Sequence, residues 1–227
     1  MLNFSQFLSE AKAAEAPKDP NRKAKHYFDI DETLFAHDHS KLRVHVKDPS
    51  GNRVRTLTNQ EFNSHQLPEG HNYDFSEFRS SDIFGKSASP IRSMIAKMKA
   101  IKKNKGNVEM LTARADLDDK QKFAGHMGKY GIDITPGSGI HVRRAGNIGG
   151  KPADSKAAHI ADAIKKEKLS EVNLYDDSID NIKGMLKLKK DFPEVTFHGH
   201  HVQHDPQTGR VKIETHSVEP KKKKGNE

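Results

Sequence analysis

KHYFDIDETL, residues 25–34, is an apolar run that passes directly into two acids separated by one residue. Residues 25–31 are typical of a buried strand, and ligands of open parallel sheets bind at the carboxyl ends of such strands. Residues two apart in an extended chain point to the same side, so Asp29 and Asp31 are expected to enter one pocket. Two close carboxylates repel each other, and a divalent cation or a proton relieves the repulsion. One carboxylate can then attack phosphorus while the other protonates the leaving oxygen.

Strands and helices alternate downstream of this run. The expected elements are a helix at 90–103, a strand at 107–112, a helix at 117–130, a strand at 139–143, a helix at 154–167, a strand at 171–175 and a helix at 178–190. This alternation predicts a parallel sheet with right-handed crossovers. Two last strands, near 195–202 and 210–216, are joined by a turn at 205–209. The residues expected in the core are Phe28, Ile30, Leu34, Met110, Leu111, Val172 and Leu174.

The polar segment at 36–89 separates the first strand from this region. Strands at 43–46 and 53–57 are expected around the turn Pro49-Ser50-Gly51-Asn52, followed by an irregular stretch. Six basic or imidazole side chains of this segment either meet an anionic substrate or simply line an exposed hairpin. They are His37, His39, Arg43, His45, Arg53 and Arg55.

The strand at 107–112 carries the second chemical signal. It ends in Thr112, whose hydroxyl suits a phosphoryl oxygen, and Arg114 follows in the sequence VEMLTAR. Arg114 either touches the substrate or forms a structural salt bridge.

Two later signals complete the set. Lys156 lies near the start of a helix expected to open at Asp154 or Ser155, where a cation can neutralise charge on a transferring group. The strand and acids of VNLYDDS, residues 172–178, supply hard oxygen ligands of the kind that Mg²⁺ prefers.

In chain order, these four signals resemble the motifs of the haloacid dehalogenase (HAD) superfamily of phosphohydrolases. DIDET at 29–33 resembles its first motif, MLT at 110–112 its second, Lys156 its third and YDDSIDN at 175–181 its fourth. The resemblance spans about residues 25–200 and is not specific for a substrate. It implies a three-layer, Rossmann-like α/β core with a parallel sheet, a small cap insertion at about 36–89 and a C-terminal β-hairpin. It also implies a Mg²⁺-dependent phosphatase that hydrolyses a phosphomonoester.

The resemblance assigns catalytic roles to four residues. Asp29 would be the nucleophile that forms an aspartyl-phosphate, and Asp31 the general acid and base. Thr112 would hold the phosphoryl group, and Lys156 would stabilise the nucleophile and the phosphate. Lys156 is preferred, and Lys151 could replace it, because only the spacing within the loop bears on the choice.

The resemblance also implies a Mg²⁺ site. Asp176 and Asp177 would bind the ion together with Asp29 and the backbone carbonyl of Asp31. Asp180 is an alternative to Asp177. The second acid of the first motif favours phosphoryl transfer to water, because the superfamily's dehalogenases and phosphonatases lack it.

The composition of the chain excludes several classes of site and indicates the charge of its partners. The chain has 227 residues, no cysteine and a formal net charge of +8, with a mean hydropathy of -0.86. The absence of cysteine excludes disulfides, thiolate metal sites and cysteine nucleophiles. No run of the sequence is long and apolar enough to cross a bilayer. The positive charge favours a polyanionic partner or substrate, and a cytoplasmic location is expected.

The chain ends suggest a rival function. Residues 1–24 are expected to form an amphipathic segment and linker, residues 25–219 the hydrolase domain, and residues 220–227 a disordered basic tail. The N-terminal sequence resembles leaders of proteins from large tailed bacteriophages, which implies cleavage after Glu10 and a place in the host cytoplasm or the virion. A nucleotide or a phosphorylated nucleic-acid end is the expected substrate. The rival is a prohead-associated or nucleic-acid-binding protein with incidental catalysis, and the oligomeric state is left open.

A histidine-rich stretch near the C-terminus is a second candidate metal site. The histidines are His198, His200, His201 and His204. His198, His200 and His204 would share one face of a strand, but the pattern supplies no acidic partner and no gap that suggests a closed tetrahedral site. A histidine-rich strand near the edge of the sheet is expected instead.

Overall fold

The computed structural model describes residues 23–58, 61–62, 65–148 and 151–220. The expected N-terminal segment up to residue 22, with Glu10, and the basic tail from residue 221 lie outside the described residues.

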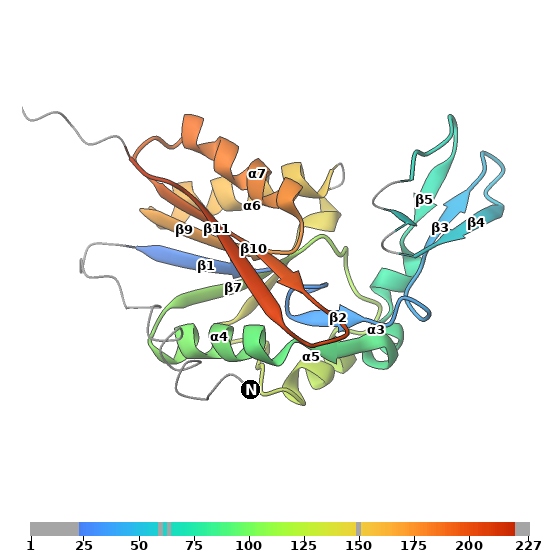
Figure 1. The fold of residues 1–227 in the computed structure, drawn as a ribbon, viewed down its shortest axis with the longest axis horizontal. Coiled ribbons are helices and arrows are strands. Elements are labelled where there is room, and N and C mark those ends of the chain that lie inside the picture. The colour runs from blue at the N-terminus through green and yellow to red at the C-terminus, as the bar shows by residue number, and fades with distance from the viewer. Residues whose placement is uncertain (1–22, 59–60, 63–64, 149–150, 221–227) are drawn as a thin grey trace, which may run out of the picture.

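A six-stranded sheet forms the centre of the fold (Figure 1). Its strands are β1 (Ala24–Phe28), β7 (Asn107–Thr112), β8 (His141–Arg144), β9 (Glu171–Asp176), β10 (Thr196–His204) and β11 (Val211–Val218). Their order is β11-β10-β9-β1-β7-β8, and every neighbouring pair is parallel except β10 with β11. The chain is therefore an α/β protein with a mixed, mostly parallel sheet, as the alternating pattern predicted.

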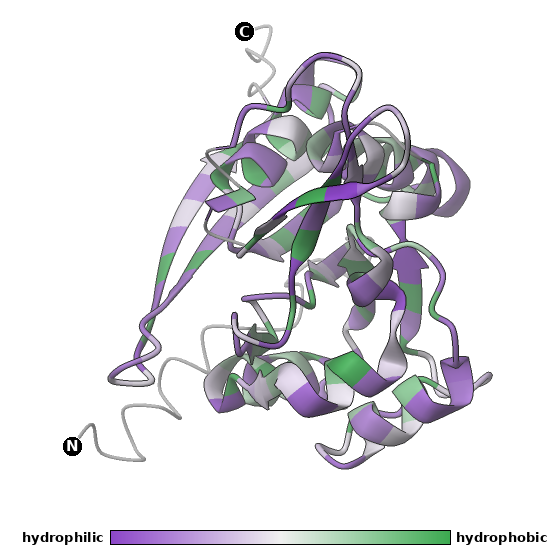
Figure 2. Ribbon diagram, turned by 90° about the vertical axis from the view of Figure 1, so that its right-hand side faces the viewer, coloured by the Kyte–Doolittle hydropathy of each residue, from purple (hydrophilic) through white to green (hydrophobic). Residues whose placement is uncertain are grey.

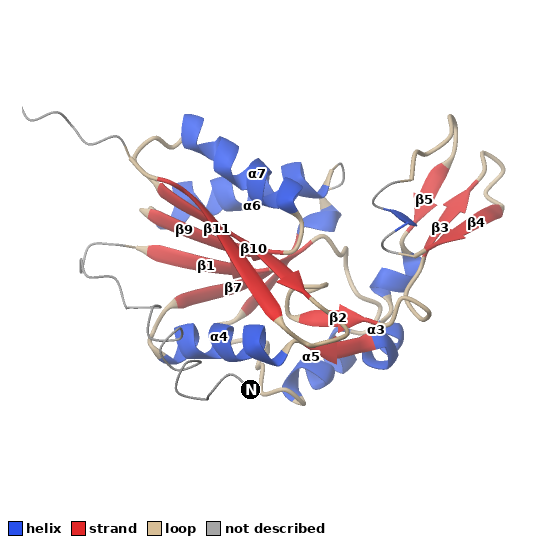
Figure 3. Ribbon diagram, in the orientation of Figure 1, coloured by secondary structure: helices blue, strands red, loops and turns tan. Residues whose placement is uncertain are grey.

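Helices cover both faces of the sheet (Figure 3). They are α4 (Arg92–Lys103), α5 (Lys120–Gly128), α6 (Pro152–Glu167) and α7 (Ile179–Lys187), with short 3-10 turns η2 (Ala145–Asn147) and η3 (Leu188–Lys190). One apolar cluster packs α4 and α5 against the sheet, and a second packs α6 and α7 against the other face. Hydrophobic and hydrophilic residues alternate along these helices in Figure 2, as expected for helices with one buried face. All seven residues predicted for the core are buried.

Helix boundaries depart from the predicted ones by a few residues, and capping explains why. The helix α5 begins at Lys120, because the Asp119 side chain accepts a hydrogen bond from the backbone N–H of Lys122. The expectation that Asp154 or Ser155 opens α6 is wrong. Pro152 occupies the first turn, where its missing N–H costs nothing, and Lys151 takes the N-cap position.

The segment after β1 leaves and rejoins the core through a pair of short strands. β2 (Phe35–His37) pairs with β6 (Ala88–Pro90), and residues 38–87 between them are called the insert. The insert holds an antiparallel sheet of β4 (Arg53–Leu57), β3 (Val44–Lys47) and β5 (Asn72–Asp74), which projects to one side of the core (Figure 1).

The β3–β4 hairpin was predicted, but the irregular stretch expected after it is wrong. This stretch contains β5, the 3-10 helix η1 (Ser76–Arg79) and the helix α3 (Ser81–Ser87). β5 has only three residues and no apolar alternation, so its pairing with β3 supplies the order that its sequence does not indicate.

The last two strands form the predicted C-terminal hairpin. The Asp205 carboxylate accepts hydrogen bonds from the backbone of Gln207 and Thr208, and Gly209 takes a positive φ of 67°. Every helix within the described ranges is too short or too polar to cross a membrane.

Two histidines are held neutral on the sheet face beside α4. Burial lowers the pKa of His26 to about 4 and that of His200 to about 3, from 6.5. His200 stacks on Tyr175 with ring centroids 4.2 Å apart, and its Nδ1 and Nε2 contact Thr215 and Asn173. The expected histidine-rich strand is thus next to the edge strand and bonded within the sheet.

We expect these histidines to make the protein sensitive to acid. Their depressed pKa values contribute stability above pH 6.5 that is lost as pH falls toward 4, because the unfolded chain takes up protons first. Each pKa unit corresponds to about 1.4 kcal/mol. Urea unfolding between pH 7 and pH 4 should show a smaller loss for His200→Gln than for the wild type. The exposed His141→Gln is the control, and an unchanged slope for His200→Gln would contradict the prediction.

Candidate active site

Three carboxylates meet where β1 and β9 end. These strands are neighbours, and the Asp29 N–H donates to the Tyr175 carbonyl at 2.9 Å, which fixes the chain just beyond β1. Ligand oxygens of Asp29, Asp176 and Asp177 lie within 4.8 Å of one another. The alternative ligand Asp180 is exposed in the first turn of α7. The structure therefore brings Asp177, and not Asp180, into the cluster.

A buried lysine joins this cluster from α6. The Lys156 ammonium lies 2.6 Å from Asp29 Oδ1 and 2.7 Å from Asp176 Oδ2, and the residue is only 1% exposed. Lys156 shares the inward face of α6 with Ile160 and Ala163, one turn and two turns further on. Lys151 is exposed at the N-cap of the same helix. The helix face therefore selects Lys156.

Other polar groups fix the orientation of the two acids after β9. Asp176 Oδ1 accepts hydrogen bonds from the Ser178 backbone N–H and from the Asn181 side-chain amide. His201, on β10, donates through Nε2 to the Asp177 carbonyl at 2.9 Å. The Gln203 amide donates to His201 Nδ1, which is consistent with the proton being on Nε2.

The cluster carries more negative charge than its lysine balances. Burial raises the pKa of Asp29 to about 7, with Asp176 and Asp31 adding to the rise and Lys156 opposing it. Burial and the charges of Asp176 and Asp29 also raise the pKa of Asp177 well above its usual range. Burial alone would lower the pKa of Lys156, but the two carboxylates outweigh it and raise the value.

This electrostatic imbalance fits a bound divalent cation. Carboxylate oxygens are the hard ligands that Mg²⁺ selects, and the cation would favour the charged carboxylates against the burial and mutual repulsion that raise the two aspartate pKa values. Asp29, Asp176 and Asp177 are the residues that would hold it.

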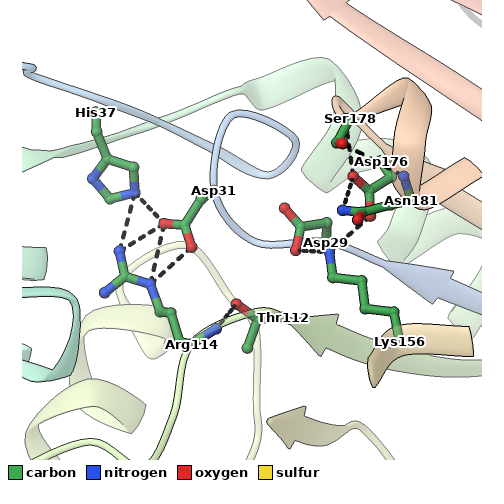
Figure 4. A network of polar contacts seen from close by, with 9 residues as sticks. All are labelled: Asp29, Asp31, His37, Thr112, Arg114, Lys156, Asp176, Ser178 and Asn181. Carbon is green, nitrogen blue, oxygen red and sulfur yellow. Dashed lines mark hydrogen bonds and ion pairs between the residues drawn. The ribbon is translucent and has the colours of Figure 1, made fainter. Parts of the chain in front are cut away.

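Asp31 is held by a different set of residues. Arg114 donates from Nε and Nη2 to the carboxylate, and His37 Nε2 lies 2.6 Å from Asp31 Oδ1 (Figure 4). Burial alone would raise the pKa of Asp31. The positive charge of Arg114 and the hydrogen bonds from His37 and Arg114 outweigh burial, so the pKa lies well below its usual range.

Arg114 is itself fixed by the insert. Its Nη1 donates to the Phe78 carbonyl at 2.6 Å, and its guanidinium lies 5.2 Å from the ring centroids of both Phe78 and Phe84. Its own backbone N–H donates to Thr112 Oγ1, which leaves the Thr112 hydroxyl proton free for another acceptor. Of the two readings of Arg114, the structure shows the salt bridge.

A close backbone contact supports the Arg114 loop. A Cβ added to Gly146 would lie 2.3 Å from the Ala113 carbonyl and 2.8 Å from the Arg114 carbonyl carbon. Only glycine therefore allows η2 to approach this loop so closely.

The six cationic or imidazole residues of the insert region do not act as a group. Arg53 and Arg55 are exposed on β4, whereas His45 is buried against Thr56 and Glu77. His37 alone among the six contacts a predicted site residue within the described part of the chain.

The structure thus brings together Asp29, Lys156, Asp176 and Asp177. Figure 4 shows Thr112, Asp31 and Arg114 beside Asp29, Lys156 and Asp176. The contacts made by His37, Asn181 and His201 were missed. Asn181 had a signal, since it follows the Asp-Asp pair in the predicted motif. The sequence marked His37 as a substrate candidate and His201 as a metal candidate, but it could not give their contacts, because their partners are set by tertiary structure.

No protein-family model matches this chain, and no curated protein is significantly similar to it.

Proposed function

We propose that this chain is a Mg²⁺-dependent phosphohydrolase of the HAD type, which hydrolyses a phosphomonoester through an aspartyl-phosphate on Asp29. One observation carries the proposal: a carboxylate cluster, a buried lysine and a second acid lie together at the carboxyl edge of a parallel sheet. The order of the four sequence motifs along the chain supports it. The α/β sheet with helices on both faces is compatible with a HAD core, and the insert follows β1, where a small cap is expected.

The first proposed step forms a bond between Asp29 and phosphorus. The Asp29 carboxylate oxygen attacks the phosphorus, the ester P–O bond breaks, and Asp31 gives a proton to the leaving oxygen. Lys156 contacts Asp29 and steadies the nucleophile, and the Thr112 hydroxyl, which accepts from the Arg114 N–H, can donate its own proton to a phosphoryl oxygen. Bound Mg²⁺ would supply positive charge that offsets charge on the phosphoryl group.

The second proposed step returns the enzyme to its starting state. Asp31, now a carboxylate, takes a proton from water as the water oxygen attacks the phosphorus. The bond between phosphorus and Asp29 breaks, and inorganic phosphate leaves. The environment of Asp31 favours the carboxylate form, which suits this step, whereas the first step needs a proton on Asp31 that Arg114 and His37 disfavour.

The substrate class rests on charge. The net charge of +8 favours an anionic substrate, and we propose a nucleotide or a phosphorylated nucleic-acid end. Residues 36–89 contain seven Lys or Arg and seven Asp or Glu, so the excess positive charge lies elsewhere in the chain.

The proposal is tested by phosphate release from nucleoside monophosphates, sugar phosphates and 3′- or 5′-phosphorylated oligonucleotides. We expect release in Mg²⁺ that stops when EDTA is added and returns when Mg²⁺ is restored in excess. Faster turnover of sugar phosphates would replace the proposed substrate class. Absence of turnover across a broad panel of phosphomonoesters, despite Mg²⁺ binding, would contradict the phosphatase and direct attention to salt-dependent nucleic-acid binding.

A further inference from the structure

We infer that His37 is a positioning residue for the proposed reaction. Its contact with Asp31 presents one defined oxygen of that carboxylate to the leaving group. The inference rests on the proposed function. The His37 side chain is buried at the end of β2, directly before the insert, and both of its ring nitrogens have polar partners.

The His37 ring is fixed from two sides. Its Nε2 lies 2.6 Å from Asp31 Oδ1, and its Nδ1 lies 3.0 Å from Ser87 Oγ. A carboxylate only accepts hydrogen bonds, so Nε2 donates, and the Ser87 hydroxyl can donate to Nδ1. The His37 backbone N–H donates to Glu32 Oε1 at 3.1 Å, which ties β2 to the loop that carries Asp31.

Glu32 makes this connection in a costly backbone conformation. Its φ is 56°, in the left-handed region that glycine usually occupies. Its N–H donates to the Phe35 carbonyl, and its side chain accepts from His37. The loop from Asp31 to His37 is therefore closed by contacts at both ends.

The two carboxylate oxygens of Asp31 have different numbers of polar contacts. Oδ1 lies 2.6 Å from His37 Nε2, 2.6 Å from Arg114 Nη2 and 3.1 Å from Arg114 Nε. Oδ2 has one contact, at 2.9 Å from Arg114 Nε, among the hydrogen bonds of the described residues. In Figure 4, His37 approaches Asp31 from the side away from Asp29. Oδ2 is thus the oxygen that His37 leaves available for proton exchange with the leaving group.

A serine hydrolase is the other chemistry that these residues suggest, and burial argues against it. Ser87, His37 and Asp31 form a hydrogen-bonded chain, but Ser87 is 3% exposed at the end of α3. A nucleophile must reach its substrate, so this chain serves to fix Asp31.

The leaving group provides a test of positioning. Esters with poor leaving groups, such as alkyl phosphates, need a well-placed acid, whereas p-nitrophenyl phosphate needs little protonation. General acid catalysis contributes about 10²–10⁴-fold. We expect His37→Phe to lower kcat for an alkyl phosphate about tenfold more than for p-nitrophenyl phosphate. His37→Gln, which retains a donor, should recover part of the difference.

His45→Phe is a matched control. His45 is also a buried histidine between a carboxylate and a hydroxyl, with Nε2 2.8 Å from Glu77 and Nδ1 3.0 Å from Thr56. Neither of these side-chain hydrogen bonds, within the described part of the chain, reaches a candidate site residue. Replacement of His45 should leave the ratio of the two kcat values unchanged. Equal losses on both esters for His37→Phe would make His37 a structural residue and overturn the inference.

Unfolding measurements separate a lost contact from lost folding. A double-mutant cycle of His37→Phe and Asp31→Asn in urea should show a coupling energy that His45→Phe and Asp31→Asn do not show. Absence of coupling would overturn the inference even if the variants are inactive. A wild type that hydrolyses neither ester would instead show that the proposed function is wrong, and the role of His37 in it would fail for that reason.

Discussion

Replacing Asp29 by asparagine is expected to lower Mg²⁺-dependent phosphate release by at least about a thousandfold, because the amide cannot form the covalent intermediate. The same change should stabilise the metal-free protein. Burial raises the pKa of Asp29 to about 7, so above that pH the folded protein holds a carboxylate that it disfavours. Activity and stability therefore change in opposite directions, which a merely structural aspartate would not produce.

The effect on stability depends on pH. The Asp29 carboxyl has a pKa of 3.8 in the unfolded chain and about 7 in the folded one. Its contribution is therefore fully present below pH 3.8 and is lost as pH rises through 7. A rise of roughly three units corresponds to about 4 kcal/mol, at about 1.4 kcal/mol per unit.

Thermal unfolding in EDTA from pH 5 to pH 8.5 measures this contribution. The wild type should lose stability with rising pH more steeply than Asp29→Asn, and Mg²⁺ should restore much of the loss in the wild type. Asp180→Asn removes the same charge from an exposed position nearby and should match the wild type. An Asp29→Asn variant less stable than the wild type at pH 8 in EDTA would show that the cluster is not electrostatically strained.

Most of the carboxylate cluster could be predicted from the sequence. The acids after β1 and β9 were predicted to meet, because parallel strands place their carboxyl ends at one edge. The sequence favours Lys156 and keeps Lys151 as an alternative, and the helical spacing of Lys156, Ile160 and Ala163 is the signal that separates the two lysines. Because α6 begins at Pro152, Lys151 lies outside the helix, and only Lys156 can share its inward face.

The surroundings of Asp31 could not be predicted in the same way. Arg114 is 83 residues away in sequence from Asp31, and its partners Phe78 and Phe84 belong to the insert. The insert has short strands and little apolar periodicity, so its position over Arg114 follows from tertiary packing. Motif spacing therefore predicted which residues meet in the candidate site but not the contacts that orient them.

Lys156→Met is expected to be the most destabilising of these substitutions. Methionine fills a similar volume but leaves Asp29 and Asp176, which are 5% and 0% exposed, without their shared cation. Removing one partner of a buried ion pair costs about 3–5 kcal/mol. Urea unfolding at pH 7.5 in EDTA should show this loss, and Lys151→Met, at the exposed start of the same helix, should stay near the wild type.

A second substitution distinguishes lost charge from lost packing. If unpaired carboxylates cause the loss of stability, the double variant Lys156→Met with Asp29→Asn has one unpaired carboxylate fewer and should be more stable than Lys156→Met alone. The effects of the two substitutions on the free energy of unfolding will then not be additive. Mg²⁺ should also stabilise Lys156→Met more than it stabilises the double variant, because the double variant has one carboxylate ligand fewer. Additive losses, or a double variant less stable than Lys156→Met alone, would instead indicate that Lys156 acts through packing against α6 and the sheet.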